Sequence, residues 1–168
     1  LVPQSLDRDC DLARIAFGQT VAVTGLQLAC AKAAAVNGGK YYSPRLLKSI
    51  VLPNNKKVVN EPVLKFRPIS ENTSSILAEM LEGVVTEGSG KKAYIEGYRV
   101  GGKTGTAQKY EDGHIASGKY ISSFVGFFPA DKPQYLALII VDEPQGTYYG
   151  SAVAAPVAKE IFEDIIRI

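Results

Sequence analysis

The stretch GYRVGGKTGTAQ, residues 97–108, decides how the rest of the chain is interpreted. Glycines and β-branched threonines surround Lys103, so residues 99–109 are predicted to form a strand. Two more apolar segments follow, 120–128 and 135–141, joined by about six residues. A parallel crossover needs a dozen residues or more. The three segments therefore predict an antiparallel sheet.

Three helices are predicted around this sheet. Thr24 is a good N-cap for an alanine-rich segment that stops at Asn37-Gly38-Gly39, and Ser70 caps a second segment with apolar residues at helical spacing. The third helix has Pro156 in its first turn. The segment 41–66 is predicted as a β-hairpin with its turn at 53–55, and 110–118 as a polar loop. The fold class is α+β, an antiparallel sheet covered by helices. The predicted helices are 26–36, 71–86 and 151–168.

The composition of the chain argues against several classes of function. The 168 residues are 46% hydrophobic and 21% charged, which is typical of one globular domain. A single histidine, His114, and two cysteines, Cys10 and Cys30, are too few for a multi-histidine or four-cysteine zinc site, and the two thiols can pair or stay reduced. The net charge of +2 and the lack of long Lys/Arg runs argue against nucleic acid as a partner. No segment is long and apolar enough to span a membrane, so the chain as given is expected to be soluble.

Residues 97–104 also match the phosphate-binding pattern GxxxxGK[ST], and the apolar run before Asp142 resembles a magnesium-binding aspartate segment. That pattern binds phosphate only when a helix begins at the lysine. Here Lys103 is followed by Thr104-Gly105-Thr106 and then by a polar run without an apolar face. A nucleotide hydrolase is therefore the disfavoured alternative.

Several segments together support another interpretation. Lys103-Thr104-Gly105 is the Lys-Thr-Gly element of penicillin-binding proteins and β-lactamases. With the other segments, in this order, the chain resembles the transpeptidase domain of class B penicillin-binding proteins, most of all the sporulation- and division-specific enzymes of Gram-positive bacteria. The resemblance implies a partial β-lactamase/transpeptidase-like fold. The other segments are 17–19, 21–29, 37–39, 42–46 and 124–130.

The resemblance implies roles for four residues. Lys103 makes the site electropositive, Thr104 and Thr106 bind the carboxylate of a D-Ala-D-Ala stem peptide or a β-lactam, and the Thr106 amide is an oxyanion-hole donor. Gly105 lets a substrate backbone approach the strand. Strand alternation puts the two threonines on one face, which leaves open which hydroxyl contacts the ligand. The chemistry needs no cofactor or metal. The resemblance also places the parent protein outside the cytoplasm, anchored to the membrane.

The nucleophile motif of the family, Ser-x-x-Lys at a helix start, has one formal match, at Ser89, which lies in a glycine-rich loop. Ser70-Glu71-Asn72 matches the second motif, Ser-x-Asn, but its serine is the predicted helix cap. We therefore expect 1–168 to be the C-terminal half of a transpeptidase domain that is inactive alone. Exposed apolar surface predicts self-association or docking of the remaining half. The alternative is a non-catalytic module of the same fold that serves protein contacts.

Overall fold

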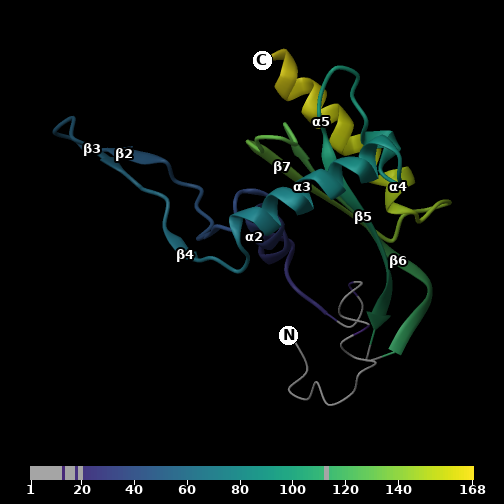
Figure 1. Cartoon of the computed structure of the whole chain (residues 1–168). Helices are drawn as coiled ribbons and strands as arrows, with labels where there is room; N and C mark the ends of the chain where they lie inside the picture. The colour runs from purple at the N-terminus through teal and green to yellow at the C-terminus, as the bar shows by residue number, and fades with distance from the viewer. Residues whose placement is uncertain (1–12, 14–17, 19–20, 112–113) are drawn as a thin grey trace.

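The computed structural model describes residues 13, 18, 21–111 and 114–168. Its centre is a three-stranded sheet with helices on both faces, and a long two-stranded arm extends away from this body (Figure 1). Among the described residues, no helix is long and apolar enough to cross a membrane. The helices are α2 (Gly25–Val36), α3 (Glu71–Thr86), η1 (Lys91–Ala93), α4 (Gly150–Val153) and α5 (Ala155–Arg167), and the sheet strands are β5 (Gly101–Glu111), β6 (His114–Phe128) and β7 (Tyr135–Asp142).

The first two helices begin at the predicted caps. Thr24 forms a full capping box with Gln27, whose backbone N–H donates to the Thr24 hydroxyl. The Ser70 hydroxyl accepts from the N–H of Thr73 in the same way. Ser74 then links the helices, because its hydroxyl donates to the carbonyl of Ala35 at 2.9 Å. Both predicted helices are confirmed.

The third predicted helix, 151–168, is divided in two. α4 ends at Val153 and α5 begins at Ala155, with Pro156 in its first turn. Proline has no N–H and its ring clashes with the carbonyl four residues earlier, so one continuous helix from 151 is excluded. The single-helix prediction is wrong at this point and correct for the remainder.

The sheet order is β5-β6-β7, all antiparallel, as the short link predicts. β6 and β7 are longer than predicted, whereas β5 has the predicted length but lies two residues further along the chain, at 101–111 instead of 99–109. Tyr110 pairs with Ile115 and Glu111 with His114, so most of the predicted loop 110–118 is strand, and β6 begins at 114 instead of 120. Lys119 contributes to this extension by bonding the Glu111 carboxylate at 2.7 Å. Cross-strand pairing of this kind depends on the partner strand, which a local pattern does not contain.

Two apolar clusters pack on opposite faces of the sheet. Phe124 and Phe162 are fully buried on the face that α5 covers. Phe127, whose side chain points to the other face, packs with Val36 of α2 and Ala78 of α3. The side chains of β6 that point to one face therefore pack against α5, and those that point to the other face pack against α2 and α3.

The arm comprises residues 41–66. β2 (Ser49–Val51) and β3 (Lys57–Val59) form the predicted antiparallel hairpin, with Asn55 at a φ of +62° in its turn. The strand before the turn is shorter than predicted. At the base of the arm, β1 (Tyr41–Tyr42) pairs with β4 (Leu64–Phe66), a pairing that the sequence pattern did not specify. The rings of Tyr41 and Phe66 stack there at 4.8 Å.

Candidate functional site: the edge of strand β5

The outer edge of β5 presents the backbone groups of Thr104 and Thr106. The N–H of Glu143 donates to the carbonyl of Tyr120, so even-numbered residues of β6 bond to β7 and odd-numbered ones bond to β5. Odd-numbered residues of β5 pair with odd-numbered residues of β6. The N–H and C=O groups of Thr104 and Thr106 consequently point away from β6, toward the edge. An extended peptide can pair with such an edge.

The side chains along this edge divide between two faces, as alternation predicts. Lys103 and Gly105 share one face, and Thr104 and Thr106 share the other. The Lys103 ammonium donates to the outward carbonyl of Thr104 at 2.9 Å. Thr106 Oγ1 accepts the N–H of Gly150 at 3.2 Å, so its own hydrogen remains available for donation. The four predicted residues therefore form one cationic, hydroxyl-bearing segment, in which Lys103 and Thr106 are exposed and Thr104 and Gly105 are half-buried.

Ser89 is an additional member of this site. Its hydroxyl lies 3.0 Å from the hydroxyl of Thr104. Ser89 belongs to the turn after α3, and only the short 3-10 turn η1 follows it. It thus has no α-helix to place a lysine beside it, as expected for a loop residue. Its contact with Thr104 was not predicted, since the two residues are 15 positions apart and no sequence signal joins them.

The glycine pair before Lys103 has a packing explanation. A Cβ on Gly101 would lie 2.3 Å from the ring of Phe127, and one on Gly102 would lie 2.4 Å from the ring of Phe124. Both rings lean across from β6 and fill the space that a side chain would need. Lys103 lies within a strand and begins no helix. The phosphate-binding alternative is therefore wrong.

Two further glycines allow close approach at the site itself. A Cβ on Gly105 would lie 2.5 Å from Ser123 Oγ, and one on Gly150 would lie 2.5 Å or less from the carbonyl oxygens of Gly105 and Ser123. The start of α4 therefore rests directly on the backbone of β5 and β6. This contact fixes the position of the strand that carries Thr106.

Lys32 contributes a second positive charge. It lies on α2, half-buried, and burial together with the nearby charge of Lys103 lowers the pKa of its ammonium group. An anion near Lys103 would experience both charges. No sequence signal indicates this role of Lys32, because the alanine-rich segment around it is typical of a packing helix.

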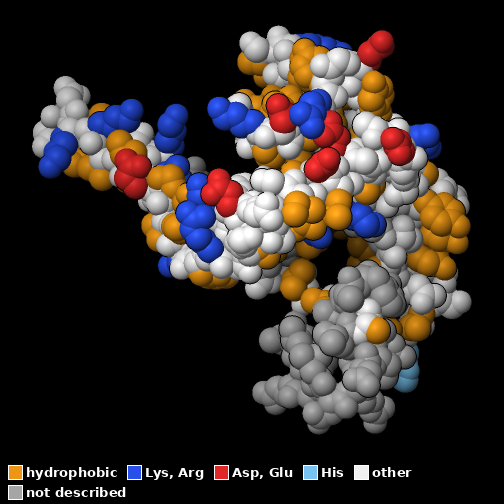
Figure 2. Space-filling model, viewed as in Figure 1, with side chains coloured by type: hydrophobic (Ala, Val, Ile, Leu, Met, Phe, Trp, Pro, Cys, Tyr) orange, Lys and Arg blue, Asp and Glu red, His pale blue; other side chains and the backbone are white. Residues whose placement is uncertain are grey.

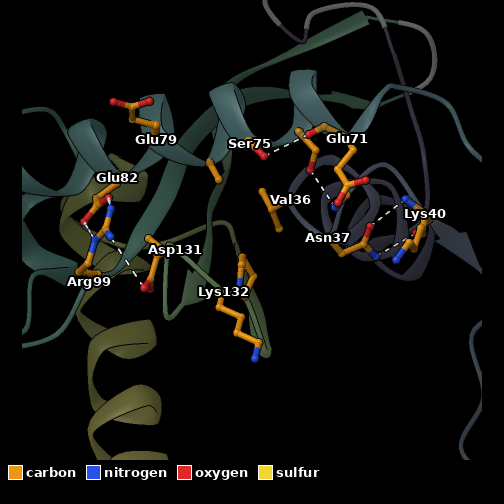
Figure 3. Close-up of a pocket in the computed structure, with 15 residues that line it drawn as sticks. Val36, Asn37, Lys40, Glu71, Ser75, Glu79, Glu82, Arg99, Asp131 and Lys132 are labelled. Carbon is orange, nitrogen blue, oxygen red and sulfur yellow. Dashed lines mark hydrogen bonds and ion pairs between the residues drawn. The ribbon is translucent and has the colours of Figure 1, made fainter.

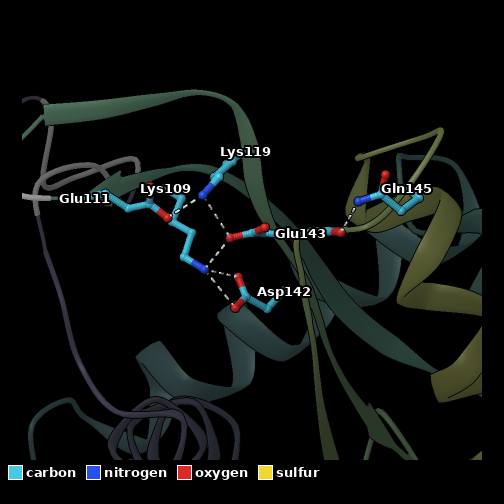
Figure 4. A network of polar contacts seen from close by, with 6 residues as sticks. All are labelled: Lys109, Glu111, Lys119, Asp142, Glu143 and Gln145. Atoms are coloured by element: carbon cyan, nitrogen blue, oxygen red, sulfur yellow. Dashed lines mark hydrogen bonds and ion pairs between the residues drawn. The ribbon is translucent and has the colours of Figure 1, made fainter.

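An ion-pair network joins the far half of the β5–β6 hairpin to the end of β7 (Figure 4). The ammonium of Lys109 bonds Glu143 at 2.7 Å and Asp142 at 3.0 Å. The bond to Glu143, then the bond to Asp142, raises the pKa of Lys109, and the bond from Lys109 lowers the pKa of Glu143. Asp142 and Glu143 therefore form ion pairs at the end of β7 while their side chains stay accessible to solvent.

A cavity lies away from this strand (Figure 3). Its volume is about 550 Å³, and it opens between the end of α2, α3 and the turn before β7. Arg99 bridges Glu82 at 2.6 Å and Asp131 at 3.8 Å on its wall, and the bond to Glu82 raises the pKa of the guanidinium. None of the predicted site residues 103–106 lines it. Among the described residues, the predicted site thus lies along a strand edge, outside this cavity.

The remaining candidate residues are the potential metal ligands, His114 and the two cysteines. Among the described residues, no group of three His, Cys, Asp or Glu side chains can hold a metal ion. His114 is exposed, but it lies on β6 instead of in a loop. Cys30 has a free thiol, and Cys10 lies outside the described residues.

Residues 3–163 match the family model of the penicillin-binding protein transpeptidase domain. The chain belongs to this family. It is 48% identical to stage V sporulation protein D of Bacillus subtilis over 155 residues, which are 90% of this chain and 24% of that protein. It is 35% identical to the peptidoglycan D,D-transpeptidase FtsI homolog of Mesostigma viride, with 90% of this chain and 28% of that protein covered. The chain thus spans about a quarter of the length of these relatives.

Solved structures confirm the fold. The transpeptidase domain of Burkholderia pseudomallei penicillin-binding protein 3 superposes with a TM-score of 0.77 at 33% identity, covering 95% of this chain and 46% of that one. Mycobacterium tuberculosis penicillin-binding protein 3 gives 0.79 at 30% identity, covering 89% and 36%. That protein has also been solved in complex with aztreonam and with ampicillin. The predicted α+β class and the family resemblance are confirmed.

Proposed function

We propose that this chain is the C-terminal part of a peptidoglycan D,D-transpeptidase domain and supplies its substrate-binding strand. The observation that carries the proposal is the edge of β5, where Lys103 lies beside the outward backbone and hydroxyl groups of Thr104 and Thr106. Membership of the transpeptidase family supports it. The substrate is a stem peptide ending in D-Ala-D-Ala, and a β-lactam occupies the same place.

In this proposal the edge does two things. The stem peptide adds to β5 as an extended strand, with its terminal carboxylate near Lys103 and the threonine hydroxyls. The outward N–H of Thr106 donates to the carbonyl oxygen that becomes negative when a serine hydroxyl attacks the carbonyl carbon. The bond to the last D-alanine then breaks, and the peptide remains as a serine ester. An amine of a second stem peptide attacks this ester and forms the cross-link.

The serine and its lysine base belong, in this proposal, to the remaining half of the domain. Neither formal match in this chain has the required setting, since Ser70 caps α3 and Ser89 contacts Thr104 in a turn. Within the described residues no strand pairs with the outer edge of β7, and Val23 and Leu26 near the start of α2 are exposed. In this proposal the remaining half docks on these surfaces. In this proposal the parent protein lies outside the cytoplasm and is anchored to the membrane.

Labelling with a fluorescent penicillin tests the proposal. The parent protein should form a stoichiometric covalent adduct, and the isolated 168-residue chain should form none. Lys103→Ala should slow the labelling of the parent, whereas Lys92→Ala, at an exposed lysine in η1, should not. A parent without any adduct would support the non-catalytic module instead, and a covalent band at Ser89 of the isolated chain would overturn the assignment of the nucleophile.

A further inference from the structure

The arm, residues 41–66, differs in charge from the remainder of the protein. It has five Lys or Arg residues and one acidic residue, a net charge of +4, whereas the whole chain is +2. The rest of the chain is therefore net negative. Figure 2 shows Lys and Arg side chains in blue along the arm, interspersed with apolar ones in orange. The basic residues are Arg45, Lys48, Lys56, Lys57 and Lys65.

The hairpin of the arm also has open edges. The N–H of Leu52 donates to Lys56 and the N–H of Asn60 donates to Lys48, each at 2.9 Å. The backbone groups of Lys57 and Val59, which alternate with these bonded positions on β3, thus point outward. In the described part of the chain no third strand pairs with β2 or β3.

Apolar side chains flank these open edges. Val51 is 65% exposed and Val59 is 49% exposed, on one face of the hairpin, and Ile50 and Val58 are exposed on the other. An isolated two-stranded hairpin is only marginally stable in water, and a third strand would cover part of this apolar surface. The arm thus has unused hydrogen-bonding groups, unburied apolar groups and a positive charge in one place.

We propose that the outer edge of β3 binds an extended acidic segment of a partner protein, which adds as a third strand. Outward N–H and C=O groups pair with the backbone of the segment, the valines cover its apolar side chains, and the lysines pair with its carboxylates. A lipid surface fits less well. The tip of the arm, Pro53-Asn54-Asn55, is polar, and the apolar residues lie along the sides, where a strand but not a bilayer reaches them.

The test uses the full chain and a fluorescent peptide of alternating Val and Glu, measured by anisotropy. We expect saturable binding that weakens about tenfold or more between low and high salt, because the charges are exposed. Lys56→Glu/Lys57→Glu should abolish it. The matched control Lys91→Glu/Lys92→Glu changes another adjacent, exposed lysine pair by the same charge and should have a much smaller effect.

A second peptide isolates the contribution of the backbone. It has the same side chains but N-methylated amides on its pairing edge, so it keeps the charge and loses the ability to add as a strand. We expect it not to bind. Equal binding of both peptides, or equal loss in the two charge-reversal variants, would overturn the proposal. Failure of the Val-Glu peptide to bind would also overturn the proposal. So would arm-dependent binding that is seen only with anionic phosphatidylglycerol vesicles, or only with a second copy of the chain. Penicillin labelling of the parent is independent of all these outcomes.

Discussion

Replacing Gly105 by alanine tests two separate reasons for a glycine at that position: packing against Ser123 and access for a ligand. The new Cβ would lie 2.5 Å from Ser123 Oγ, well inside contact distance, but 3.9 Å from Ser123 Cβ, which is an ordinary contact. The clash is therefore with one hydroxyl that can rotate away. Overpacking lowers the free energy of unfolding by about 1–3 kcal/mol. Because the Ser123 hydroxyl can rotate, we expect a loss of about 1 kcal/mol here. For a chain of this size that corresponds to a fall in Tm of about 2–4 °C.

The double variant Gly105→Ala/Ser123→Ala removes the clash while keeping the new methyl group. Thermal unfolding of the four proteins of this cycle should show that Ser123→Ala recovers most of the loss, which gives a coupling of about 1 kcal/mol. The rate of penicillin acylation, measured on the parent protein, should stay low in the double variant. The reason is that the methyl group still occupies the face along which the ligand backbone approaches.

Recovery of acylation together with stability would refute this reasoning. Gly105 would then be required only to accommodate Ser123, and not to admit a ligand. Additive losses of stability in the two single variants would equally refute the packing argument, because they would mean that Ser123 Oγ is not what the new methyl group meets.

Three further predictions concern contacts around the same strand. Gly150→Ala places a Cβ within 2.5 Å of two carbonyl oxygens that have no freedom to rotate, so its unfolding midpoint should fall more than that of Gly105→Ala. Ser89→Ala removes the hydroxyl contact with Thr104 and should cost about 0.5 kcal/mol in urea unfolding, whereas Ser89→Thr should not. Lys109 lowers the pKa of Glu143, so the native state binds fewer protons there than the unfolded state. Stability should thus fall as pH drops below the ordinary glutamate value of about 4.3, and Glu143→Gln should flatten that limb of a Tm–pH curve.

The sequence predicted best those elements whose determinants are local. Thr24 and Ser70 define their helix starts within three residues, and both helices begin there. The Lys-Thr-Gly element and Thr106 likewise occupy consecutive positions, so the sequence alone predicts that residues 103–106 lie in a strand.

What the sequence did not predict depends on distant partners. The end of β5 and the start of β6 are set by their pairing with each other, so a loop was predicted at 110–118 where most residues form strand. Ser89 joins the site through a contact 15 residues away, and Lys32 through the packing of α2. No local pattern distinguishes such residues from ordinary surface positions, because their role is set by what lies beside them in space.

The two threonine hydroxyls of β5 are each in contact with a segment remote in the chain, Ser89 after α3 and Gly150 at the start of α4. Under the proposed function, variation that changes how the strand binds a ligand is therefore not confined to positions that contact the ligand. Replacements at Ser89 should then alter ligand binding from a distance, whereas any side chain at Gly150 would first destabilise the fold.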